Sequence, residues 1–151
     1  MKKIKRVAMC GLLVFAVFLW LLLSAGEINA QVSCSDTTLN GCFGITWMGD
    51  RIDGGNPGPR AGVGQITFNG QGSLSGSVTK SSNGVISQVT GTGTYTVNPN
   101  CTGSATITDS DGETRDFNFV IVETFIVGAI EVFAIQTDAG RAITLDLKRC
   151  L

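Results

Sequence analysis

Apolar and polar residues alternate along short segments of this chain with a period of two. In 73–79, Leu74, Gly76 and Val78 share one face, while Ser and Thr residues occupy the other. In 89–97, four Thr residues alternate with Val, Gly and Tyr residues. Successive side chains of a β-strand point to opposite faces, and one polar face is typical of antiparallel sheets. The pattern therefore predicts half-buried antiparallel strands.

Turn residues separate the alternating segments. Asn69-Gly70 and Asn83-Gly84 are dipeptides that tight hairpins prefer, and Asp111-Gly112 marks a later turn. Turns and alternation together predict eight strands, at 42–48, 61–69, 72–80, 85–97, 104–109, 114–123, 129–138 and 141–149.

One of these segments, 117–122, is apolar on both faces. Its β-branched and aromatic residues favour a strand over a helix. Apolar residues on both faces indicate that this strand is buried on both sides.

Eight consecutive strands with short connections predict an up-and-down meander. A flat sheet of eight strands exposes two edges, and closure into a barrel removes both. We therefore expect an all-β fold, a single eight-stranded antiparallel up-and-down barrel. A two-sheet β-sandwich is the alternative.

The first thirty residues have the pattern of a secretory signal peptide. Four Lys and Arg residues come first, residues 7–23 are apolar, and residues 24–30 are small and weakly polar. This predicts cleavage before Gln31, which leaves 31–151 as one β-barrel domain that is secreted or periplasmic. An uncleaved membrane anchor is the alternative, because the apolar run reaches the lower limit for a spanning helix.

The net charge argues against two classes of partner. Residues 1–30 carry four of the 11 Lys and Arg residues and one of the 12 Asp and Glu residues, so the remainder has a net charge of −4. A mildly acidic domain without basic clusters is a poor nucleic-acid binder. It also lacks the polybasic stretch that binds anionic lipid. We expect no nucleic-acid partner, and no membrane association once the signal peptide is removed.

The four cysteines after the apolar run are expected to form disulfides. Cys34, Cys42, Cys101 and Cys150 are an even set in an exported chain, and none belongs to a C-x-x-C pair. In a closed barrel the start of the first strand lies beside the end of the last. We therefore predict Cys42–Cys150 across the seam, which leaves Cys34–Cys101. A local Cys34–Cys42 bridge with Cys101–Cys150 is the alternative.

The chain contains no histidine, which excludes several chemistries. A Ser-His-Asp triad, a Cys-His pair and a His-ligated metal site are all ruled out. No phosphate-binding G-x-x-x-x-G-K-[ST] motif is present. We expect no metal, no cofactor and no catalytic residue.

The predicted inner face mixes small and large residues. Seven of its positions are Gly or Ala, at Gly62, Gly64, Gly76, Gly91, Gly93, Ala105 and Ala134. Small residues either leave a cavity or make room for large rings opposite them, and an eight-stranded barrel is wide enough for both. The candidate ligand-binding residues are aromatic side chains and one carboxylate that could face inward at a barrel end: Trp47, Phe68, Tyr95, Phe117, Phe119 and Glu123.

Several motifs resemble those of small secreted bacterial proteins, mostly uncharacterised. The motifs are Cys34-Ser35, Leu39-Asn40-Gly41-x-Phe43-Gly44, the segment 64–72 and the segment 93–103. The group is similar to calycin-type barrels such as lipocalins and allene oxide cyclase, and this resemblance implies a fold rather than a function. Its pattern includes Cys34 and Cys101, which fits their pairing. Cys42 and Cys150 depart from it, and two additional cysteines most simply pair together.

Three functions are compatible with these features. The first is a secreted, non-catalytic barrel that binds a small apolar ligand. The second is a cofactor-free isomerase of the allene oxide cyclase type, working through Glu123 or Tyr95. The third is a structural or cell-surface module without a ligand. A continuous internal cavity separates the first two from the third, and a buried carboxylate inside that cavity favours the second.

Overall fold

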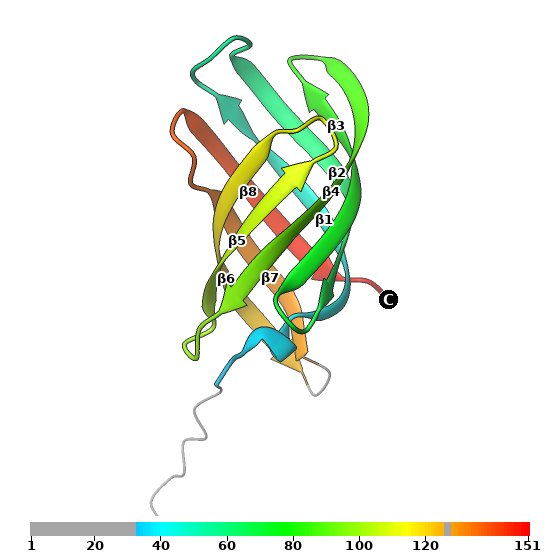
Figure 1. Cartoon of the computed structure of the whole chain (residues 1–151), viewed down its shortest axis with the longest axis vertical. Helices are drawn as coiled ribbons and strands as arrows, with labels where there is room; N and C mark the ends of the chain where they lie inside the picture. The colour runs from blue at the N-terminus through cyan, green and yellow to red at the C-terminus, as the bar shows by residue number, and fades with distance from the viewer. Residues whose placement is uncertain (1–32, 126–127) are drawn as a thin grey trace, which may run out of the picture. The chain divides into compact units, whose positions relative to one another are not determined.

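A computed structural model describes residues 33–125 and 128–151 of the chain, and residues 33–151 form one unit. Eight antiparallel strands follow one another around a closed barrel (Figure 1). The strands are β1 (Asn40–Arg51), β2 (Gly58–Asn69), β3 (Ser73–Ser82), β4 (Val85–Val97), β5 (Thr102–Asp109), β6 (Thr114–Phe125), β7 (Gly128–Gln136) and β8 (Arg141–Arg149). A short 3-10 helix, η1 (Asp36–Thr38), precedes them.

The barrel closes because the first strand pairs with the last. β1 lies between β2 and β8, from Phe43 beside Arg149 to Arg51 beside Arg141. The predicted up-and-down barrel is therefore confirmed, and the sandwich alternative is wrong. Strands β1 and β2 are longer than their alternation suggested, so the irregular connection between them is only 52–57.

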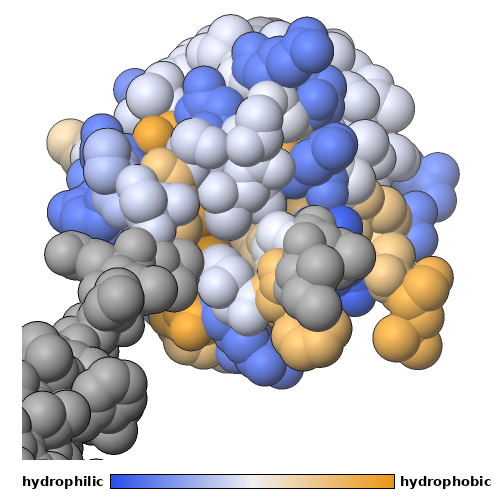
Figure 2. Space-filling model, turned by 90° about the horizontal axis from the view of Figure 1, so that it is seen from below, coloured by the Kyte–Doolittle hydropathy of each residue, from blue (hydrophilic) through white to orange (hydrophobic). Residues whose placement is uncertain are grey.

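Aromatic rings and η1 close one end of the barrel, the lower end in Figure 1, where η1 lies. The ring of Phe68 makes edge-to-face contacts with Phe43 and Tyr95, at centroid distances of 5.4 and 5.0 Å. The Tyr95 hydroxyl donates to the backbone oxygens of Leu39 (2.8 Å) and Asp36 (3.1 Å). Figure 2 views this end and shows hydrophobic and hydrophilic residues side by side on it.

Two disulfides hold the chain, as predicted. Cys42–Cys150 joins β1 to the residue after β8, and Cys34–Cys101 joins the segment before η1 to the connection between β4 and β5. The alternative pairing is wrong. Two disulfides suggest an oxidising, extracellular compartment. The predicted signal peptide lies outside the described residues, and among the residues described no helix is long and apolar enough to cross a membrane.

The expectation that 117–122 is buried on both sides is wrong, although the segment is a strand. A single closed barrel has only one interior, so alternate residues of β6 must face outward. The outward side chains of Val120, Val122, Phe133 and Ile135 on β6 and β7 are 39–50% exposed.

Candidate ligand-binding site

A cavity of about 120 Å³ opens at the upper end of the barrel, opposite η1. Its apolar wall is formed by inward side chains of seven strands, namely Ile45, Trp47, Ile66, Leu74, Val78, Val89, Ile107, Phe117, Ile143 and Leu145. A smaller void of about 30 Å³ lies below it and shares part of this lining. The lower void is lined by apolar side chains only, so water has no polar side chain to bind there.

Glycines make room for the large rings of the interior. A Cβ atom on Gly62 would lie 2.1 Å from the Trp47 ring, and one on Gly103 would lie 2.2 Å from the Phe119 ring. Gly62 and Trp47 are direct cross-strand neighbours, so the missing side chain lets the indole lie across β2. Gly76 and Gly91 instead line the cavity. The small inner residues therefore have both of the expected roles: Gly62 makes room for a large ring, and Gly76 and Gly91 leave space for the cavity.

The upper end of the lumen is strongly charged. Five of the seven Lys and Arg residues after residue 33 gather there, and they are Arg51, Arg60, Lys80, Arg115 and Arg141. Four of them line the cavity together with two carboxylates, Asp109 and Glu113. The cavity lining therefore carries two positive charges in excess, although the domain as a whole is acidic.

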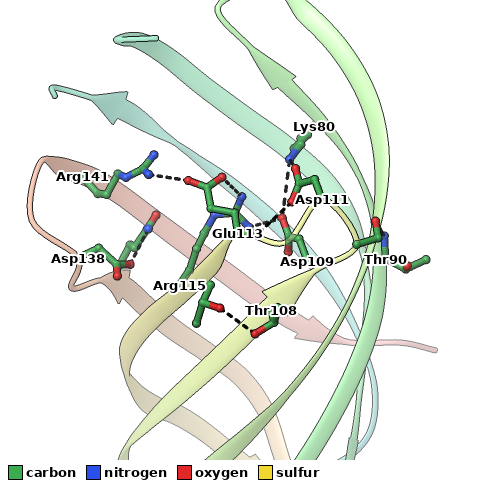
Figure 3. A network of polar contacts seen from close by, with 12 residues as sticks. Lys80, Thr90, Thr108, Asp109, Asp111, Glu113, Arg115, Asp138 and Arg141 are labelled. Atoms are coloured by element: carbon green, nitrogen blue, oxygen red, sulfur yellow. Dashed lines mark hydrogen bonds and ion pairs between the residues drawn. The ribbon is translucent and has the colours of Figure 1, made fainter. Parts of the chain in front are cut away.

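Glu113 is the centre of one half of this polar network (Figure 3). Its two carboxylate oxygens each accept a hydrogen bond of 2.6 Å, from Arg115 and from Arg141, and Arg51 lies 3.8 Å away. Burial alone would raise the pKa of Glu113, but the guanidinium groups of Arg115 and Arg141 outweigh it and hold the pKa below its usual value.

Asp109 is the centre of the other half. Its side chain is 7% exposed, Arg115 donates a hydrogen bond to it, and the Lys80 ammonium lies 3.7 Å away. Lys80 also pairs with Asp111 in the β5–β6 turn, and this hydrogen bond holds the pKa of Asp111 below its usual value. Burial would lower the pKa of Arg115, but its contacts with Asp109 and Glu113 raise it. The network is thus a set of ion pairs that fixes each charged group.

Arg60 is the cation that this network leaves out. Its Nη2 donates to the backbone oxygen of Asn56 at 2.5 Å, while its Nε is buried and has no hydrogen-bond partner. No carboxylate in the described part of the chain forms an ion pair with it. Burial, and then the nearby Arg51 and Arg141, lower the pKa of Arg60.

The structure separates the six side chains predicted to bind a ligand. Trp47 lines the main cavity, Phe68 and Phe119 line the small void beneath it, and Phe117 lines both. Tyr95 is buried at the closed end, where its hydroxyl holds η1.

The sixth residue, Glu123, lies elsewhere. It is exposed beside a register shift in the β6–β7 pairing, near the closed end, and lines neither cavity.

The sequence analysis did not place the charged residues of the open end inside the lumen. Their positions nevertheless continue the inward period of their strands. Lys80 follows Val78 by two residues, Arg115 precedes Phe117 by two, and Arg60 precedes Gly62 by two. Extending each alternation by one step would have placed these cations inside the barrel mouth.

The described residues contain no cluster of three or more His, Cys, Asp or Glu side chains able to hold a metal ion. The charged groups at the mouth alternate in sign, and each carboxylate there already contacts a Lys or Arg side chain. What this arrangement offers a ligand is an apolar wall with cationic hydrogen-bond donors above it.

Comparison with known proteins supports the fold and nothing finer. A solved structure of a redesigned β-barrel is similar to this chain, with a TM-score of 0.56 and 17% sequence identity. The alignment covers 81% of this chain and 100% of the designed one. At this identity the similarity shows the barrel architecture alone. No family model and no curated protein matches the chain.

Proposed function

We propose that this protein is a secreted, non-catalytic barrel that binds a small apolar ligand in the cavity at its open end. The observation that carries the proposal is a cavity of about 120 Å³ with an apolar wall, closed below and open above. A dry engineered cavity of about 150 Å³ binds benzene, so this space suits one ring or a short alkyl chain.

Rigidity supports a binding role. The strands that line the cavity form an uninterrupted ring of backbone pairing, and a disulfide joins β1 to the end of β8. A preformed pocket loses little conformational entropy when a ligand enters. The two disulfides and the resemblance to small secreted bacterial proteins support export, and the pattern of residues 1–30 is that of a cleaved signal peptide.

A cofactor-free isomerase is the second candidate, because Asp109 is a buried carboxylate at the cavity. Its burial is explained without catalysis, since Arg115 and Lys80 compensate its charge. The carboxylate proposed for that chemistry, Glu123, is exposed and away from the cavity. Binding therefore accounts for more of the site than isomerisation does.

Titration with 1-hexanol tests the proposal, because Trp47 is the only tryptophan after residue 33 and its indole lines the cavity. We expect saturable quenching or enhancement of its fluorescence. Native mass spectrometry of protein from its own culture would then identify a bound molecule.

A pair of variants supplies the control. Val78→Phe fills the cavity and should abolish hexanol binding. Val63→Phe makes the same change on the outer face of β2, where the side chain is 57% exposed, and should leave binding intact. Equal binding by both variants, or no binding of hexanol by the unmodified protein, would contradict a ligand-binding cavity.

A further inference from the structure

We infer that the cavity takes an amphipathic anion, with the apolar body against Trp47 and an oxyanion head group on Arg60. This inference rests on the proposed function and adds the chemical class of the ligand. It is carried by three independent features of the open end: an excess of cations, an unpaired guanidinium, and an apolar wall directly beside it.

The first feature is the uneven pairing of charge in the lumen. Arg51, Lys80, Arg115 and Arg141 share three carboxylates, those of Asp109, Asp111 and Glu113. Every one of these carboxylates is therefore already engaged by at least one cation. The lumen has no spare carboxylate to neutralise a fifth cation.

The second feature is Arg60, which is that fifth cation. A guanidinium has five N–H donors, and here one is known to be used, by the Asn56 backbone oxygen. The buried Nε without a partner is a desolvated donor, and such groups are costly unless a ligand or water completes them. Arg side chains bind carboxylate and phosphate oxygens with two parallel hydrogen bonds, so this site fits an oxyanion.

The lowered pKa of Arg60 is consistent with an oxyanion site at this residue. Burial lowers it first, and repulsion from Arg51 and Arg141 lowers it further. A bound anion offsets this repulsion and favours the charged guanidinium.

The third feature is the arrangement around Arg60. Gly62 lies two residues along β2 on the same inward face, and the Trp47 indole occupies the space that Gly62 leaves. On the other side, Ser82 of β3 is the direct cross-strand partner of Arg60, and it also lines the cavity. A ligand whose body lies on Trp47 therefore ends at the guanidinium and a hydroxyl.

The chemical class follows from the size of the site. The cavity of about 120 Å³ holds an apolar body of roughly six carbon atoms or one ring. A single guanidinium with a neighbouring hydroxyl suits a small monoanionic head. A short-chain or aromatic carboxylate meets both requirements, and inorganic phosphate meets only the second.

The test compares hexanoate with 1-hexanol, which share a six-carbon chain and differ in the head group. Binding is followed by Trp47 fluorescence and by calorimetry. We expect hexanoate to bind at least about tenfold more tightly than hexanol at low salt. The preference should shrink as ionic strength rises from about 0.05 to 0.5 M, because the mouth is open to solvent.

Charge-removing variants locate the head group. Arg60→Gln should bring the affinity for hexanoate down to that for hexanol, and Arg60→Lys should restore part of the difference. Lys148→Gln removes the same charge from a side chain that is 66% exposed on β8, and it should change neither affinity. Circular dichroism and thermal unfolding establish that each variant is folded.

Three results would overturn the inference, and they distinguish it from the proposed function. Equal affinities for hexanoate and hexanol would remove the anion site while leaving apolar binding intact. A hexanoate preference that survives Arg60→Gln would assign the head group elsewhere. Binding of inorganic phosphate alone, without either six-carbon ligand, would overturn both the ligand class and the proposed function.

Discussion

Removing the disulfides one at a time tests how the barrel is held together. The perturbation is a pair of double variants, Cys34→Ala/Cys101→Ala and Cys42→Ala/Cys150→Ala. The two bridges span 67 and 108 residues and are interleaved along the chain. A disulfide stabilises the native state largely by restricting the unfolded chain, and the effect grows slowly with the loop that it closes.

The loop lengths taken separately predict one order of stability. At 25 °C the chain-entropy treatment assigns about 4.4 kcal/mol to the 67-residue loop and about 4.8 kcal/mol to the 108-residue loop. On this basis, loss of Cys42–Cys150 would be the more destabilising change.

The interleaved arrangement removes that difference. While one bridge is intact, the other closes a ring of about 57 residues, which runs from Cys34 to Cys42 and from Cys101 to Cys150. Both bridges then close the same ring, so each contributes about 4.2 kcal/mol to the unfolded-state term.

The burial of the cysteine side chains instead decides which of the two variants is less stable. Cys34 is 4% exposed and belongs to the core, with Cys101 packed against it, whereas Cys42 and Cys150 are half-buried. Truncation of a buried side chain adds about 1 kcal/mol of lost packing. We therefore expect the variant without Cys34–Cys101 to be less stable by about 1 kcal/mol than the variant without Cys42–Cys150.

Urea unfolding followed by Trp47 fluorescence and far-ultraviolet circular dichroism measures both free energies of unfolding. The denaturant dependence should also increase in both variants, because the unfolded chain becomes less compact. A larger loss on removing Cys42–Cys150, or an almost unchanged stability in either variant, would refute the reasoning.

Three further outcomes are expected. Tyr95→Phe should lower the free energy of unfolding by about 1–3 kcal/mol, because it leaves the buried backbone oxygen of Leu39 without its donor; equal stability by urea unfolding would contradict this role. Gly62→Ala should displace the Trp47 indole, shift its emission and weaken hexanol binding, and an unchanged spectrum would speak against the contact. Because the pKa of Glu113 is lowered in the folded state, its stabilising effect is present above about pH 5 and is lost as the pH falls through the folded value. Glu113→Gln should therefore make the unfolding temperature, measured by calorimetry, depend less on pH over this acid range.

The closed barrel could be predicted from the sequence because its local signals agree. The alternation in 73–79 and 89–97 determines which side chains face inward, and the Asn-Gly turns determine the hairpins. The pairing of β1 with β8 then followed from the need to remove two sheet edges. Closure in turn placed Cys42 beside Cys150.

The candidate site was predicted less well, for two physical reasons. Strand ends are poorly marked by composition, so Arg60 fell outside the predicted strand 61–69, although β2 carries it into the lumen. Arg115 lay within the predicted strand 114–123, but it was not assigned to the inner face. Ion pairs also join residues that are far apart in the sequence. The carboxylate that compensates Lys80 comes from β5, and nothing in the spacing along the chain joins the two.

The aromatic candidates illustrate the same limit. The alternation of inward and outward side chains does not tell how deep in the barrel an inward residue lies. It therefore cannot distinguish Trp47, which lines the cavity at the open end, from Tyr95, whose hydroxyl binds η1 at the closed end. Depth along the barrel axis depends on the stagger between strands, which is a property of the whole sheet.

The covalent link between Cys42 and Cys150 has a consequence for association. A strand of one molecule could replace the equivalent strand of another only if the ring first opened, and the disulfide opposes opening at the β1–β8 junction. Within the described residues, closure leaves only short unpaired edges, such as the start of β4 from Val85 to Val89, which pairs with β3 but extends beyond β5. Reducing agents should therefore convert a protein that resists strand exchange into one that is open to it.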